Sequence, residues 1–331
     1  MDEATFAVPL WGWAAVGAVI AVMLAVDVLS HRDNHIIELR EAVVWSAVWI
    51  TAGLAFGLVV LVWLGGEPAV AYYSGYLLEK ALSVDNVFVF ALLFGYFRVP
   101  DEYQHKVLFW GVVGALAFRL AFIFAGAELL HRLAWAGLAL GAFLVWTGWR
   151  LAVRGEPDVD PDRNPVVRLF RRLVPTDPRY HGSRFTVRVD GRRKATVLLV
   201  ALVAIEGTDV VFAVDSVAAI LAITTDTFLV WTATAFAVLG LRSLYFCLAG
   251  LLRHFEYLRY GLAVVLAFAG VKLILAETPV GEVPVWLTLA VVVLALATSI
   301  AWGRVAAWPG RRRARRARRR ARRRRISPRD G

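Results

Sequence analysis

Two stretches of the chain place acidic and polar side chains inside otherwise apolar sequence. The first reads EKALSVDNVFVF from Glu79, and the second reads DVVFAVDSVAAI from Asp209. An ionised side chain near the centre of a bilayer costs roughly 2.5–3.5 kcal/mol, so it normally faces a bundle interior or water and indicates function. Carboxylate, amide and hydroxyl oxygens suit hard cations such as Mg²⁺, Ca²⁺ or Mn²⁺. We therefore predict a metal-cation site with the ligands Glu79, Asp85, Asn86, Glu206, Asp209, Asp215 and Ser216.

Helical spacing divides these residues between two faces. Glu79 and Asn86 follow an i, i+7 spacing, as do Asp209 and Ser216, which puts each pair on one side of its helix. Two other acids, Asp85 and Asp215, point about 100° away. Each of them could bind another cation, relay a proton or hold an arginine.

Two arginines, Arg119 and Arg242, lie inside the apolar spans that follow the two motifs, and we predict that they compensate the buried acids. They could pair with Asp85 or Asp215 as purely structural ion pairs. Even with Lys80 counted, the basic groups are fewer than the acids, so negative charge remains. Such a surplus in a medium of low dielectric constant favours a bound cation or protonation.

The composition places the whole chain in a membrane. Of its 331 residues, 59% are hydrophobic, and the mean hydropathy is +0.62. A spanning helix needs about 20 apolar residues. We predict an all-α polytopic membrane helix bundle, a single membrane domain over 1–331, with about nine transmembrane helices near 9–29, 43–64, 69–97, 107–127, 133–152, 195–222, 228–250, 257–276 and 284–303.

The two motifs belong to an internal repeat. When Glu79 is superposed on Asp209, Asp85 falls on Asp215, and the following spans match around Arg119 and Arg242. Three helices are duplicated, so we predict repeat one over 69–152 and repeat two over 195–276. Because three crossings are an odd number, the second copy enters from the opposite face, giving an inverted 3+3 repeat. Such repeats are typical of transporters that bind substrate near the bilayer midplane.

Basic residues set the expected orientation. Arginines concentrate in the 153–194 connection and after the last span at 284–303, which puts these segments in the cytoplasm and the N-terminus outside. We expect 153–194 to be a cytoplasmic linker in which only RFTVRVD, at 184–190, indicates a strand. The tail, 304–331, is expected to be disordered and to contact anionic lipids. We expect no nucleic-acid partner despite the net charge of +11, and no oligomeric state follows from the sequence.

Other classes of function are weighed against transport. We expect no enzyme, because no Walker loop is present and EGTDV around Asp209 lacks the G-x-G-D pattern of an intramembrane aspartyl protease. No permanently bound cofactor is expected, since the cation would be the transported substrate. A membrane scaffold that recruits soluble stress-response proteins through the 153–194 segment and the tail is the alternative.

With these residues in place, the chain resembles the TerC family of bacterial membrane proteins, which includes the Alx-type proteins. The resemblance rests on GYLLEKALSVDNVFVFALLFGYFRVP at 75–100, EGTDVVFAVDSVAAILAIT at 206–224 and GLRSLYFCLAG at 240–250. It implies an inner-membrane exporter of a divalent metal, with Mn²⁺ as the expected substrate, and the same acidic motif residues as the site. The family is named for tellurium resistance; we expect any such effect to be indirect, because an acidic site repels an oxyanion.

Overall fold

The computed structural model describes most of the chain. The residues described are 8–30, 38–133, 135–154, 164–189, 191–248, 258–276, 278, 283–284, 286–299 and 301–302. The predicted tail at 304–331 and the start of the 153–194 connection, at 155–163, lie outside this part of the chain.

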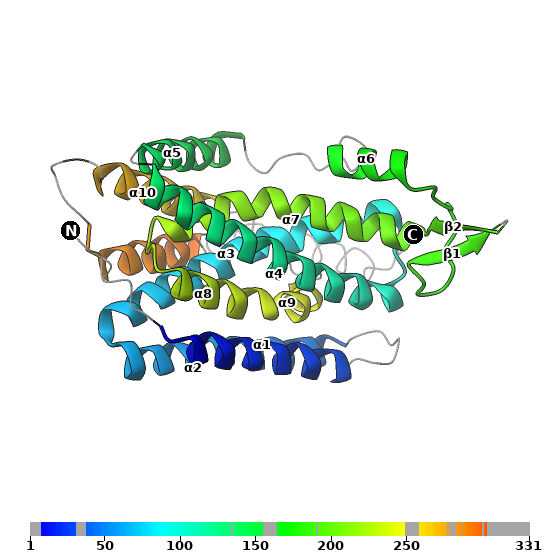
Figure 1. The fold of residues 1–331 in the computed structure, drawn as a ribbon, viewed down its shortest axis with the longest axis horizontal. Helices are drawn as coiled ribbons and strands as arrows, with labels where there is room; N and C mark the ends of the chain where they lie inside the picture. Colours follow the sequence, from blue (N-terminus) through cyan, green and yellow to red (C-terminus); the bar gives the residue numbers. More distant parts are fainter. Residues whose placement is uncertain are drawn as a thin grey trace, which may run out of the picture.

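Long helices dominate the fold and run side by side in a bundle (Figure 1). The helices are α1 (Leu10–Ser30), α2 (Leu39–Leu64), α3 (Gly66–Phe97), α4 (Asp101–Arg132), α5 (Ala136–Arg154), α6 (Pro165–Leu173), α7 (Val197–Leu221), α8 (Thr227–Leu239), α9 (Leu241–Leu248) and α10 (Leu258–Ala276). Two short strands, β1 (Thr186–Val189) and β2 (Arg192–Ala195), pair antiparallel. A further apolar helix covers Trp286–Ser299.

Seven helical segments within the described residues are long and apolar enough to span a membrane: α1, α2, α4, α5, α7, the α8–α9 pair and α10. The chain is therefore a polytopic helical membrane protein, as predicted. Two of the nine expected spans differ from these. Helix α3 has 32 residues but carries Glu79, Lys80 and Asp85, and the helix Trp286–Ser299 is shorter than a full span.

Helix α8 lies at the centre of the bundle. In its span, Thr227–Cys247, 83% of the residues are buried, against 22% in the spans of α1 and α2. Helix α3 packs against α7 and α8, and α4 packs against the same two helices. The peripheral helices instead expose large apolar side chains, such as Val62 of α2, which is 88% exposed. An apolar outer surface of this kind is suited to contact with lipid. The central helices α3, α4, α7 and α8 thus form the core that can hold charged groups away from lipid.

Helices α5 and α10 approach each other most closely through small residues. A Cβ atom added at Gly141 would lie 2.7 Å from the carbonyl oxygen of Gly270, and one added at Gly148 would lie 2.7 Å from that of Ala263. Close backbone approach through small residues is how membrane helices gain van der Waals contact, since lipid chains are as apolar as leucine.

The connection at 153–194, expected to be a linker, is folded over much of its length. Asn164 caps α6 by accepting a hydrogen bond from the Val166 amide over 2.9 Å, with Pro165 at the first helical position. The strand expected within 184–190 is confirmed as β1. Its partner β2 lies beyond the one segment for which a strand is predicted, and three of its four residues, Arg192, Arg193 and Lys194, are charged.

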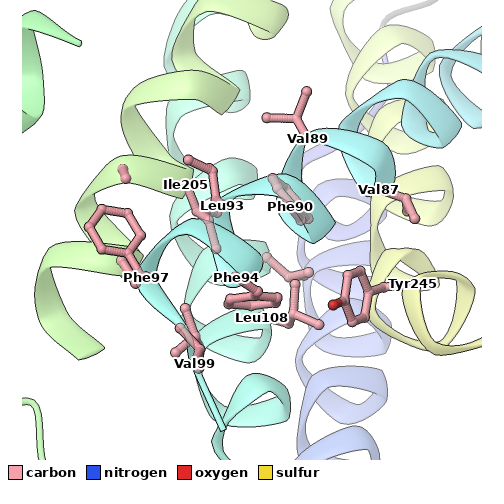
Figure 2. Packing of buried hydrophobic residues seen from close by; sticks show 14 of the residues in the cluster. Val87, Val89, Phe90, Leu93, Phe94, Phe97, Val99, Leu108, Ile205 and Tyr245 are labelled. Atoms are coloured by element: carbon pink, nitrogen blue, oxygen red, sulfur yellow. The ribbon is translucent and has the colours of Figure 1, made fainter. Parts of the chain in front are cut away.

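The folded connection packs onto the ends of the bundle helices. Tyr180 donates a hydrogen bond to the carbonyl of Phe97 over 2.8 Å, and Lys106 donates one to that of Ser183 over 2.6 Å. Val167 of α6 joins the apolar cluster that α3, α4, α7 and α9 build at this end. Figure 2 shows this cluster, with Phe94 of α3, Leu108 of α4 and Tyr245 of α9 in one layer of packed side chains.

The α5–α10 contact yields a stability prediction. Gly141→Val should lower the thermal stability of the purified protein in detergent, because the added methyl groups meet the backbone of α10 and overpacking costs about 1–3 kcal/mol. Gly17→Val in α1 is the matched control, because a Cβ atom there meets no atom within 4 Å. Equal melting temperatures for the two variants would contradict the close contact.

Candidate functional site

Three central helices bring five polar or charged side chains together. Glu79 and Asn86 come from α3, Arg119 from α4, and Asp209 and Ser216 from α7. All five are at most 2% exposed. Helical spacing predicted that Glu79 and Asn86 share a face and that Asp209 and Ser216 share another, and both faces meet at Arg119.

Arg119 is the centre of this cluster. Its guanidinium forms an ion pair with the Glu79 carboxylate and a second one with Asp209, whose Oδ1 lies 3.3 Å from Nη2. Nη1 also donates to Ser216 Oγ over 3.3 Å, and Asn86 Nδ2 donates to Asp209 Oδ1 over 3.2 Å. One cation therefore cross-links three helices from inside the bundle.

The charges of the cluster do not balance. Two carboxylates face one guanidinium, and a buried charge is costly unless it is paired and hydrogen-bonded. Glu79 Oε2 and Asp209 Oδ2 are buried and have no hydrogen-bond partner within the described part of the chain. These oxygens retain acceptor capacity that a cation could use.

A third carboxylate, Glu206, lies one turn before Asp209 on α7 and is half-buried. Its side chain lies against Gly114 of α4, where a Cβ atom would collide with the carboxylate. Its Oε2 is buried without a hydrogen-bond partner among the described residues. Gly114 thus provides the space that lets a third acid sit beside the cluster.

Asp215 lies elsewhere. Its Oδ1 accepts a hydrogen bond from Thr147 of α5 over 3.5 Å, and Arg150, one turn further along α5, acts on it electrostatically. The structure therefore does not bring Asp215 to the Arg119 cluster. The side chain of Asp85, in α3, is outside the described residues.

Arg242 is also absent from the cluster. It lies at the start of α9 and pairs with Asp27 of α1, donating to both the Asp27 carboxylate and its backbone carbonyl, the latter over 3.0 Å. From the sequence alone, Asp27 is equally consistent with an interfacial anchor and with a residue of the transport pathway. An acid inside an apolar span marks Asp27 as unusual, but no spacing rule predicts its pairing with Arg242, which lies 215 positions away.

Lys80, the neighbour of Glu79, binds a helix outside the cluster. Its ammonium donates to the carbonyl of Ala237 over 3.0 Å, at the C-terminal end of α8. Gly240, between α8 and α9, leaves room for it, because a Cβ atom there would lie 2.8 Å from the lysine nitrogen. A cation near unpaired helix carbonyls is favourable, so Lys80 stabilises the break between α8 and α9.

Among the described residues, no group of three or more His, Cys, Asp or Glu side chains is close enough to hold a metal ion. Glu79 and Asp209 are instead bridged by Arg119. Chemically, the cluster holds a guanidinium where two carboxylates, a carboxamide and a hydroxyl converge.

The Asp27–Arg242 pair yields a prediction about stability. Arg242→Gln should destabilise the protein by about 3 kcal/mol, because Asp27 loses its guanidinium partner while buried. Adding Asp27→Asn should restore most of the thermal stability measured in detergent. Arg132→Gln is the control, since its pair with Glu128 is exposed and contributes at most about 1 kcal/mol. A double variant as unstable as Arg242→Gln would contradict the pairing.

The chain is similar to known membrane proteins over most of its length. The family model of the integral membrane protein TerC family matches residues 64–308. An uncharacterized membrane protein of Myxococcus xanthus is 44% identical over 266 residues, which cover 80% of this chain and 83% of the relative. A protein of Escherichia coli strain K12 named "Putative membrane-bound redox modulator Alx" is 41% identical over 278 residues, or 81% of this chain and 86% of the relative.

A protein of Photorhabdus laumondii with the same name is 41% identical over 276 residues, or 81% of this chain and 86% of the relative. No solved structure matches the chain. The region that the family model matches contains Glu79, Arg119 and Asp209. The chain is a multi-pass integral membrane protein and belongs to the TerC family.

Proposed function

We propose that this protein is a secondary transporter that exports a divalent cation, Mn²⁺, across the bacterial inner membrane. The observation that carries the proposal is the buried cluster in which Glu79 and Asp209 face each other across Arg119. Mn²⁺ is the substrate implied by the resemblance to Alx-type proteins, and carboxylate and neutral oxygen ligands suit it.

The charge count favours a cation over an anion. A third carboxylate, Glu206, lies one turn before Asp209 on α7, so the acids here outnumber the one guanidinium. Glu79 Oε2, Glu206 Oε2 and Asp209 Oδ2 are buried and have no hydrogen-bond partner within the described residues. An anion would add to this negative charge in a medium of low dielectric constant, whereas a divalent cation would offset it. Arg119 then acts as the counter-ion of the cation-free state, and cation entry requires its guanidinium to leave the carboxylates.

Helix packing supports an inverted repeat around this cluster. Helices α3, α4 and α5 would correspond to α7, the α8–α9 pair and α10. A two-fold axis exchanges the contact of α3 with α8 and the contact of α4 with α7, and both contacts are present. The same axis relates α5 to α10, which pack together. Rocking of one repeat against the other would expose the cluster to each side in turn.

The α8–α9 break gives the second repeat a discontinuous helix where the first has the continuous α4. Transporters commonly place such breaks next to substrate sites. We propose that α9, which follows the end of α8 that Lys80 binds and is tied to Asp27 through Arg242, moves between the two states. Asp215, beside Thr147 and away from Arg119, would relay the proton that exchanges for the cation.

The proposed orientation puts the N-terminus outside and the C-terminus in the cytoplasm. Its support is the arginine content of α6, of the β1–β2 hairpin and of the tail, since cytoplasmic segments carry excess Lys and Arg. The described part of the folded connection would then form a cytoplasmic lobe on the ends of α3, α4 and α7.

A scaffold that recruits soluble proteins would use this lobe, but it has no need of a charged cluster inside the bundle. The name of the Alx relatives refers to redox modulation. This chain has one cysteine, Cys247, so it cannot form a dithiol of its own, and any redox effect would act through the transported metal or another protein. Transport therefore accounts for more of the buried side chains.

The proposal predicts the behaviour of inside-out membrane vesicles under an imposed proton gradient. Glu79→Gln and Asp209→Asn should each lower Mn²⁺ uptake at least about tenfold at equal membrane abundance, because each removes a charged ligand worth at least about 1.4 kcal/mol. Glu128→Gln, an exposed acid at the far end of α4, should transport as the wild type does.

A triple variant separates loss of function from loss of folding. Glu79→Gln, Arg119→Gln and Asp209→Asn together leave no buried charge among these three residues, so the protein should insert and keep its thermal stability while failing to transport. Uptake equal to wild type in this folded triple variant would reject the site. The scaffold alternative would gain if only deletion of the cytoplasmic lobe changed the phenotype.

Gly114 offers a test of Glu206. Gly114→Ala should displace the Glu206 carboxylate and lower Mn²⁺ uptake about tenfold, the effect of weakening one charged contact. Stability should change little, because the carboxylate is the end of a flexible side chain. Gly111→Ala, one turn earlier on α4, is the control, since its Cβ atom would lie 3.3 Å from a methyl of Ile205. Equal uptake by both variants would exclude Glu206 from the transport path.

A further inference from the structure

Helix α6 segregates its side chains into distinct faces. Its sequence is PVVRLFRRL, and at 100° per residue Arg168, Arg171 and Arg172 fall within one arc. Val166, Leu169 and Leu173 fall on the opposite arc. Such separation of basic and apolar residues is typical of helices that lie at a membrane surface.

A third face holds α6 to the bundle. Val167 is only 1% exposed and Phe170 packs against the same apolar cluster, which includes Leu198 and Ala201 of α7. Leu169 and Leu173 of the opposite apolar arc have no such cover, because they are 57% and 72% exposed. Folding of this chain therefore leaves one apolar edge of α6 in contact with the surroundings.

The position of α6 brings that edge to the border of the lipid-facing surface. Val166 lies against Gly207 of α7, and α6 runs along the outside of α7 (Figure 1). One turn further along the same face of α7, Val211 is 61% exposed within a candidate membrane span. On this face of α7, the stretch that α6 covers is therefore followed, one helical turn later, by a stretch whose side chains would contact lipid.

We propose that α6 is a lipid-binding anchor. Leu169 and Leu173 insert at the boundary between headgroups and acyl chains of the inner leaflet, and Arg168, Arg171 and Arg172 bind anionic headgroups. Charge complementarity selects this occupant: in the proposed orientation, on which this inference rests, α6 faces the cytoplasmic leaflet, which carries anionic lipids, and each arginine near it contributes about a fivefold gain in binding. A soluble polyanion such as RNA would match the arginines but leave the apolar edge exposed.

A spin label at position 173 tests the proposal in the full chain. Leu173→Cys in a Cys247→Ser background is labelled and reconstituted in nanodiscs of phosphatidylcholine with or without phosphatidylglycerol. With phosphatidylglycerol, collisions with oxygen should exceed those with a water-soluble nickel chelate, as for a label at Val62, which is 88% exposed on α2. Without it, the label should resemble one at Arg188, on the exposed side of β1.

The arginines supply the second arm. Replacing Arg168, Arg171 and Arg172 by Gln should abolish the difference between the two lipid compositions and leave the Val62 and Arg188 labels unchanged. A water-exposed label at position 173 in both nanodiscs would overturn the proposal, and its immobilisation on addition of RNA would assign the face to a polyanion instead. A lipid-exposed label in both would overturn the role of anionic headgroups.

Discussion

The burial of one guanidinium group between two carboxylates, inside a bundle whose outer surface is apolar, constrains the rest of this structure. Arg119 of α4 reaches Glu79 of α3 and Asp209 of α7. These ion pairs fix how far the three helices can slide along one another and how each is rotated about its own axis. Separating any of them would leave an uncompensated charge in a medium of low dielectric constant, which costs several kcal/mol. Small residues such as Gly114 permit the approach, and the mostly buried α8 closes the core beside it.

Two further cations within the bundle, Lys80 and Arg242, each hold a different helix contact in place. Lys80 holds the carbonyl end of α8 where the chain breaks before α9, and Arg242 ties α9 to Asp27 of the peripheral helix α1. Because Lys80 is adjacent to Glu79 in the sequence, a shift of α3 at the cluster would also move the Lys80 ammonium that binds the end of α8 before the α8–α9 break. In the proposed transporter, this adjacency links displacement of Arg119 by a cation to movement of α9.

Sequence patterns predicted the class of fold and part of the buried cluster. The long apolar segments and the spacing of Glu79 with Asn86, and of Asp209 with Ser216, follow from helix geometry alone. The partners of the charges did not follow from it, because Asp27 with Arg242 and Thr147 with Asp215 depend on how distant helices are rotated by packing. Helix α6 was missed since nine residues rich in arginine, within a segment rich in proline and charge, resemble a linker until the apolar cluster that receives Val167 is known.

The central claim is that Arg119 occupies the place of the cation, and Mn²⁺ binding to the purified protein tests it most directly. The loss of the free Mn²⁺ signal in electron paramagnetic resonance measures this binding for wild type and for Arg119→Gln at equal protein concentration and pH. If Arg119 competes with the cation for Glu79 and Asp209, the variant binds Mn²⁺ more tightly than wild type, and binding disappears when Glu79→Gln and Asp209→Asn are added. Weaker binding by a folded Arg119→Gln variant would contradict the account.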